Sequence, residues 1–140
     1  RRGRDRVGHG MEERRMCETM AKGAFTCWQM GGAGAVGGQV MTGLARLSRL
    51  RATFPGQIAA WPFEPLDRPV AFVEIWPSLY ADEVRAALLP GEVKDRAQMR
   101  VLAARIAADK RLDALLADVP DVARQEEGWI LGLPPRLQSG

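Results

Sequence analysis

A cluster of glycines, placed between a short apolar run and an amphipathic segment, constrains this chain more than any other feature. The cluster spans residues 31–38 and follows the run Phe25-Thr26-Cys27-Trp28-Gln29-Met30. Glycine allows backbone N–H groups to approach a ligand closely, and the start of a helix carries free N–H donors and the positive end of its dipole. A turn of this kind suits an anion, so we predict phosphate-binding residues at Gly31, Gly32, Gly34 and Gly37.

Three of these glycines, Gly32, Gly34 and Gly37, also satisfy the G-x-G-x-x-G pattern of dinucleotide-binding folds. That pattern needs a clean apolar strand before it and an acidic residue about 20 residues further on. Here the preceding run contains bulky and polar residues, and the candidate acid, Glu64, lies further away and follows a proline. The poor strand and the distant acid therefore argue against the nucleotide-binding half of a Rossmann fold. Phosphate contact outside that topology, and glycines that only let the helix pack closely, both stay open.

The composition is that of a packed domain or part of one. The chain has 140 residues, of which 46% are apolar and 26% are charged. The first fifteen residues hold six arginines, and the net charge is +3. We expect residues 1–10 to form a basic arm, either solvated or bound to nucleic acid, and residues 134–140 to form a tail. No apolar run is long enough to cross a membrane. We therefore expect a cytoplasmic protein without a membrane partner, and assembly into a homo-oligomer stays open.

Periodicity predicts alternating helices and strands, which is typical of an α/β domain. We expect helices over Met11–Ala21, from Gly38 to a point before Pro55, from Ser78 to Leu89, from Asp95 onward and over Leu112–Leu116. Apolar stripes mark two of them, formed by Met41, Leu44, Leu47 and Leu50 and by Met99, Leu102, Ala103 and Ile106. Ala24–Met30 and Ile58–Trp61 are candidate strands.

The strongest strand signal is Pro69–Trp76, which is apolar on both faces, as in a central strand covered on two sides. Only eight residues separate Trp61 from Val70, and three of them are proline. Parallel neighbours usually need a crossover of about a dozen residues or more. We therefore expect the two apolar runs to pair antiparallel, or not to be neighbours.

Glu74 interrupts this strand near its C-terminal end, where α/β sheets bind ligands. A lone buried carboxylate is costly unless it is paired, metal-bound or protonated. We predict Glu74 as a catalytic residue and metal ligand. The alternative is that it reaches the rim and pairs with an arginine, for instance one from the basic first segment.

Asp95 is the second candidate catalytic residue and metal ligand. It stands four residues before Met99 and seven before Leu102, which places it on the same helix stripe. It could instead be the N-cap of that helix, in the capping box Asp95-Arg96-Ala97-Gln98. Carboxylates that converge at a sheet end suit Mg²⁺ or Mn²⁺, which support phosphoryl transfer. Glu126 and Glu127 could add a third carboxylate or simply be solvated, whereas Cys17 and Cys27 lack the spacing of a zinc site.

An ordered set of segments resembles a known family. They are Gly23–Gln29, Gly31–Gly37, Ala60–Glu64, Val73–Leu79, Lys94-Asp95 and Glu127–Gly132. Together they resemble a family of uncharacterised bacterial proteins with a ribonuclease H-like fold, some of which carry the label "molybdopterin guanine dinucleotide synthesis". The resemblance covers the chain from Glu12 to about Leu133. It implies a mixed α/β sheet flanked by helices, of which this chain is the C-terminal part, and metal-assisted phosphodiester chemistry with Glu74 and Asp95 as the matching acids.

Three hypotheses follow. The first is a metal-dependent phosphoryl-transfer enzyme or hydrolase that acts on a nucleotide or nucleic-acid phosphate. The second is a non-catalytic nucleotide-binding protein linked to molybdenum cofactor biosynthesis. The third is a structural half-domain whose glycines and acids serve packing. Fold resemblance alone does not decide among them.

Overall fold

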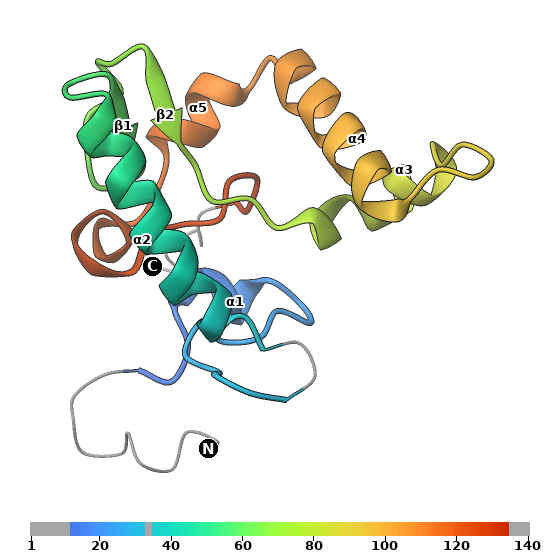
Figure 1. The fold of residues 1–140 in the computed structure, drawn as a ribbon, viewed down its shortest axis with the longest axis horizontal. Coiled ribbons are helices and arrows are strands. Elements are labelled where there is room, and N and C mark those ends of the chain that lie inside the picture. The colour runs from blue at the N-terminus through green and yellow to red at the C-terminus, as the bar shows by residue number, and fades with distance from the viewer. Residues whose placement is uncertain (1–11, 33–34, 135–140) are drawn as a thin grey trace, which may run out of the picture.

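The computed structural model describes residues 12–32 and 35–134, and it has a mixed helix and sheet architecture (Figure 1). The predicted basic arm 1–10 and nearly all of the predicted tail 134–140 lie outside the described residues. The elements in chain order are α1 (Met16–Met20), α2 (Gly37–Thr53), β1 (Ile58–Ala60), β2 (Val70–Phe72), the 3₁₀ helix η2 (Pro77–Tyr80), α3 (Ala81–Ala86), α4 (Lys94–Ala108), α5 (Leu112–Ala117) and the π-helical turn η3 (Ala123–Glu127).

The amphipathic helix predicted after the glycine cluster is present as α2, but its apolar stripe is not part of the core. Leu44 is 60% exposed and Leu47 41% exposed, and Val40 and Leu50 are also exposed. No acidic residue lies within α2, which carries the three arginines Arg46, Arg49 and Arg51. Periodicity therefore identified the helix correctly. Among the described residues, however, no element packs on the apolar stripe of α2 to bury it.

The sheet has two strands, and their direction corrects the sequence-based expectation. β1 and β2 pair in parallel, with Ile58 opposite Val70 and Ala60 opposite Phe72. Each strand is only three residues long, so the chain has to return about 10 Å to start the second strand. The loop of residues 61–69 covers that distance without a helix. The rule about long crossovers failed here because it assumes strands of ordinary length.

Side chains close the outer edge of β1. The Glu64 carboxylate accepts a hydrogen bond from the Ala60 N–H at 2.8 Å, and the Arg68 guanidinium donates to the Ile58 carbonyl at 2.7 Å. Both residues come from the connecting loop, so the loop joins the strands and also satisfies the backbone groups on this edge. Such protection is a common device at edge strands.

The main core lies where the N-terminal and C-terminal parts of the described chain meet. Cys17 from α1 and Ala21 at its C-terminal end pack with Trp129, Ile130 and Leu131, all of which are buried. A parallel bridge joins Glu74 to Ile130, and the Leu131 N–H donates to the Glu74 carbonyl at 2.9 Å. The C-terminal segment thus extends the sheet beyond the end of β1.

A second, smaller core joins α3 and α4. It consists of Val84, Ala97 and Leu102, at the end of the molecule opposite α2 and β1 (Figure 1). The predicted stripe of α4 is correct for Leu102 and partly for Ile106, which is half-buried, but Met99 and Ala103 are exposed. The helix expected over Ser78–Leu89 is split into η2 and α3 and ends at Ala86.

Candidate functional site

A large groove of about 1450 Å³ separates α2 from the β1–β2 sheet. The apolar stripe of α2 lines one wall through Val40, Leu44 and Leu47, and sheet residues including Ile58 and Phe72 line the other. Because α2 faces the sheet across this space rather than packing on it, the apolar stripe of α2 is left exposed within the groove. Its walls carry three kinds of group that could recognise a ligand.

Aromatic side chains form the first group. Trp28, Phe54 and Phe63 all line the groove and are 44%, 44% and 50% exposed, respectively. They come from the segment before the glycine cluster, from the end of α2 and from the loop after β1. Exposed rings in a recess offer flat apolar faces, on which a planar ligand can stack.

The second group is a cluster of two arginines around one carboxylate. Arg51 contacts Glu64 at 2.6 Å and Arg68 contacts it at 3.1 Å, and both arginines line the groove. The pKa of Glu64 lies below its ordinary value, mainly because of the hydrogen bond from the Ala60 N–H and then because of Arg51. The carboxylate therefore stays ionised, and the cluster retains one positive charge that it does not neutralise internally.

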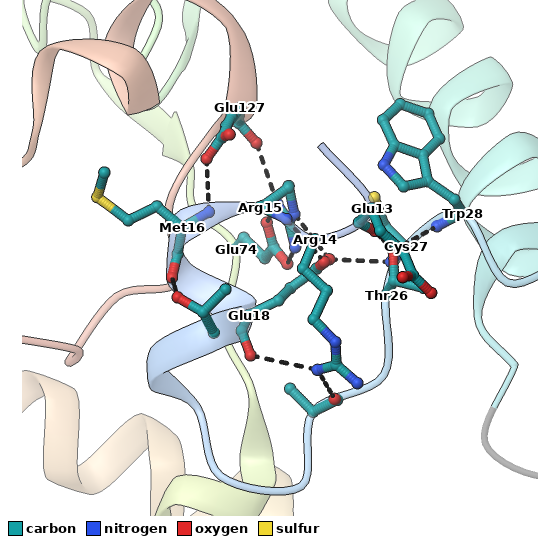
Figure 2. Close-up of polar contacts among 12 residues, drawn as sticks. Glu13, Arg14, Arg15, Met16, Glu18, Thr26, Cys27, Trp28, Glu74 and Glu127 are labelled. Atoms are coloured by element: carbon teal, nitrogen blue, oxygen red, sulfur yellow. Dashed lines mark hydrogen bonds and ion pairs between the residues drawn. The ribbon is translucent and has the colours of Figure 1, made fainter. Parts of the chain in front are cut away.

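The third group is centred on Arg15, which lies between glutamates from distant parts of the chain (Figure 2). Its guanidinium makes two bonds of 2.7 Å to the two oxygens of Glu74, one of 2.8 Å to Glu18 and one of 3.2 Å to the Glu127 carbonyl. The Glu127 carboxylate accepts from the Met16 N–H at 2.6 Å. Arg15 thereby connects α1, the end of β2 and η3.

Glu18 makes this network a buried one. It is only 2% exposed, and its carboxylate accepts from the Arg15 side chain, from the Arg15 N–H at 3.1 Å and from the Cys27 N–H at 2.9 Å. Burial lowers the pKa of Arg15, but the hydrogen bond and charge of Glu74 outweigh it and raise that pKa above its ordinary value. Arg15 is thus a permanent cation that holds its carboxylate partners in place.

The structure places Glu74 at the rim rather than in a closed interior. Its side chain is 43% exposed, and its carboxylate is engaged by Arg15 from the basic first segment. This arrangement corresponds to the second alternative derived from the sequence, in which an arginine of that segment neutralises the carboxylate. A role of Glu74 as a metal ligand stays a prediction, and a metal ion would have to take the place of Arg15.

Asp95 lies in the first turn of α4 and is exposed. It is not the N-cap, because Val93 occupies that position and makes no side-chain cap. Among the described residues, no hydrogen bond or ion pair joins Asp95 to Glu74 or to the Arg15 network. Its helix begins in the part of the molecule that holds α3, away from α1 and α2 (Figure 1).

Of the four predicted phosphate-binding glycines, Gly37 has a clear packing role. Its N–H donates to the Gln29 carbonyl at 3.0 Å, and a Cβ atom at this position would lie 2.6 Å from the Met30 sulfur and 2.9 Å from the Gln29 carbonyl oxygen. Gly31 and Gly32 are exposed, and Gly32 has a positive φ of 94°. Gly34 lies outside the described residues. Phosphate binding at this loop stays a prediction, but the Gly37 N–H is already engaged.

Both cysteines are free, and desolvation raises the pKa of Cys17 and of Cys27 to about 11. At neutral pH they are therefore thiols rather than reactive thiolates. Among residues 12–32 and 35–134, no group of three or more His, Cys, Asp and Glu side chains is placed to hold a metal ion. Within the same ranges, none of the helices has the length and apolar character required to cross a membrane.

Comparison with known proteins adds no assignment: no family model, no curated protein and no solved structure matches this chain. The candidate site therefore rests on geometry alone. Sequence inspection did not find the Arg15 network or the Arg51–Glu64–Arg68 cluster. The only local signals were the i,i+3 spacing of Arg15 and Glu18 and the i,i+4 spacing of Glu64 and Arg68.

Two alanine substitutions separate the packing role of Gly37 from the general gain in helix propensity when alanine replaces glycine. We expect Gly37→Ala to lower the free energy of unfolding by about 1–3 kcal/mol, because the new methyl group overlaps neighbouring atoms. Gly43→Ala is the matched control on the same helix. Nothing lies within 4 Å of its Cβ position, so we expect a gain of about 0.5–1 kcal/mol. Urea denaturation of both variants measures the difference, and equal effects would contradict the packing role.

The Arg15 network predicts a second pair of results. Arg15→Ala leaves the buried Glu18 carboxylate without its cation, and we expect a loss of about 3–5 kcal/mol of stability. Arg85→Ala removes an exposed arginine paired with Asp82 and should change stability by less than about 1 kcal/mol. Thermal unfolding followed by circular dichroism compares the two variants. If Arg15→Ala lowers stability no more than Arg85→Ala does, the Arg15 network does not stabilise the fold.

Proposed function

We propose that the groove between α2 and the sheet binds a nucleotide or a short single-stranded nucleic acid. One observation carries this proposal: exposed aromatic rings line the same recess as two arginines that share a single carboxylate. Rings and cations in one groove match the two chemical parts of a nucleotide, which are a flat base and an anionic phosphate.

The aromatic wall supports recognition of the base. Phe54 and Phe63 offer exposed faces within the groove, and stacking on such faces tolerates any base sequence. Typical pockets for small ligands measure about 300–1000 Å³. The groove is larger, at about 1450 Å³, and this supports a ligand of more than one nucleotide.

The arginine cluster supports recognition of the phosphate. Arg51 and Arg68 are 38% and 31% exposed, so their guanidinium groups can be reached from solvent. Because Glu64 neutralises only one of them, a phosphate oxygen could bind the remaining charge without breaking the contacts to the edge of β1. Guanidinium groups suit this role through their paired N–H donors.

The non-catalytic form of this function, linked by resemblance to molybdenum cofactor biosynthesis, uses the groove as it stands, and we therefore place it first. The alternative is a ribonuclease H-like enzyme that catalyses phosphoryl transfer. It is supported by the position of Glu74 just after β2. It further requires that Mg²⁺ or Mn²⁺ displaces Arg15 from Glu74, and that a change in conformation brings Asp95 or another acid close to Glu74.

Nucleotide binding predicts a specific loss in one arginine variant. Titration of fluorescein-labelled oligothymidylate of ten nucleotides and of a fluorescent guanosine triphosphate, followed by anisotropy, gives the affinity for each ligand. We expect Arg51→Ala to weaken binding about tenfold, as for loss of one charged hydrogen bond. For the oligonucleotide, the slope of log K against log salt should fall by about 0.7.

Arg49→Ala is the matched control, because Arg49 is on the same helix but does not line the groove. It should leave the affinity within about twofold. Phe54→Ala should weaken binding, whereas Leu50→Ala, which removes an equally exposed apolar side chain outside the groove lining, should not. Equal losses in Arg51→Ala and Arg49→Ala would show only non-specific charge attraction and would refute the proposal.

The metal-dependent form makes a separate prediction. If Mn²⁺ binds at Glu74, it competes with Arg15, so Mn²⁺ should raise the melting temperature of Arg15→Ala more than that of the unaltered chain. Glu74→Gln in the Arg15→Ala background should abolish the rise. Differential scanning fluorimetry measures all three proteins. Should Mn²⁺ leave the melting temperature of Arg15→Ala unchanged, Glu74 is not a metal ligand in this chain.

A further inference from the structure

The glutamates that line the groove differ in whether their carboxylates are already engaged. They are Glu12, Glu74, Glu126 and Glu127. Arg15 binds both oxygens of Glu74, and the Glu127 carboxylate accepts from a backbone N–H of α1. Glu12 and Glu126 are exposed, and within residues 12–32 and 35–134 neither carboxylate has a hydrogen bond or an ion pair. These two carboxylates are thus available to a ligand in the groove.

Glu126 lies two residues before Gly128, against which the Phe63 ring packs. A Cβ atom at Gly128 would lie 3.3 Å from Phe63 Cζ, so the glycine leaves room for the tip of the ring. Gly128 also has a positive φ of 73°, which glycine adopts without steric cost. Phe63 is 50% exposed and lines the groove. An exposed ring and an unengaged carboxylate therefore reach the groove from neighbouring points of its wall.

Backbone contacts fix the turn that carries Glu126. The Gly128 N–H donates to the Ala123 carbonyl at 2.9 Å, and the Arg15 guanidinium donates to the Glu127 carbonyl at 3.2 Å. The backbone at Glu126 is thus held before any ligand arrives. Only its side chain has to be ordered on binding, which keeps the entropic cost of a contact small.

Phe63 is also next to the arginine cluster. The residue that follows it, Glu64, is held by Arg51 and Arg68. The ring therefore has cations and a carboxylate as neighbours. A nucleotide that stacks its base on Phe63 can direct its phosphate to the arginines, while the polar edge of the base meets Glu126.

We propose that Glu126 makes the groove selective for bases that carry an exocyclic amino group, against thymine and uracil. An ionised carboxylate only accepts hydrogen bonds. Cytosine presents its amino donor at the position where thymine presents a carbonyl acceptor, so the carboxylate attracts the first base and repels the second. This inference rests on the proposed nucleotide function and adds a preference that stacking alone does not provide.

The experiment compares two fluorescein-labelled oligonucleotides of ten residues, one of 5-methyldeoxycytidine and one of thymidine, by anisotropy at pH 7.5. Both bases carry the same methyl group, so the comparison isolates the amino group from the carbonyl. We expect the unaltered chain to bind the 5-methylcytosine ligand about tenfold more tightly, as for one charged hydrogen bond.

Glu126→Gln should reduce this preference to less than about twofold, because an amide can accept from an amino group and also donate to a carbonyl. Glu12→Gln is the matched control. It removes the same charge from the same groove, so it should change both affinities by a similar factor and leave their ratio intact. Circular dichroism of each variant establishes that it is folded.

The outcomes separate this inference from the function on which it rests. Equal affinity of the unaltered chain for both ligands would overturn the role of Glu126 and leave nucleotide binding in place. A preference that survives Glu126→Gln, or that Glu12→Gln abolishes equally, would also overturn it. If neither ligand binds at 1 mM protein, the proposed nucleotide function fails and this inference falls with it.

Discussion

The architecture depends on one half-buried cation and the carboxylates around it. Arg15 stands between Glu18, which is almost fully buried, and Glu74, which follows β2, and it also reaches the Glu127 carbonyl. A carboxylate as deeply buried as Glu18 is tolerable only with a matched donor, and the forked guanidinium supplies several donors at once. The first segment, the sheet and the C-terminal segment are therefore held in one arrangement, on which the main core of Cys17 and Trp129 is built.

That arrangement also determines where the groove lies. Glu18, which Arg15 holds in place, accepts from the Cys27 N–H and anchors the segment that leads to Trp28. Helix α2 starts beyond this segment at Gly37, whose lack of a side chain permits close contact with Met30. The helix then passes over the sheet at a distance, which leaves its apolar stripe on one wall and the strands on the other. The electrostatic centre and the candidate ligand site thus have a common structural origin, although different residues serve each.

Local patterns in the sequence anticipated local structure but not long-range contacts. The periodicity of Leu44 and Leu47 predicted α2, and the apolar run at Ile58 predicted β1. The pairing of Glu74 with an arginine of the first segment was one of two alternatives, but nothing local identified Arg15, because these residues are 59 positions apart. The parallel pairing of β1 and β2 was missed since it depends on strand length, and the exposure of Leu44 was missed since periodicity shows which residues share a face but not what covers it.

The existence of two separate cores has a consequence for how the molecule opens. Val84, Ala97 and Leu102 form a small buried cluster between α3 and α4, separate from the buried cluster around Trp129, and the half-buried Ile75 packs against both. Regions with few buried apolar contacts open at lower free energy than the rest of a protein. The α3–α4 pair should therefore behave as a distinct cooperative unit, one that can unfold and refold while the body anchored by Arg15 stays native.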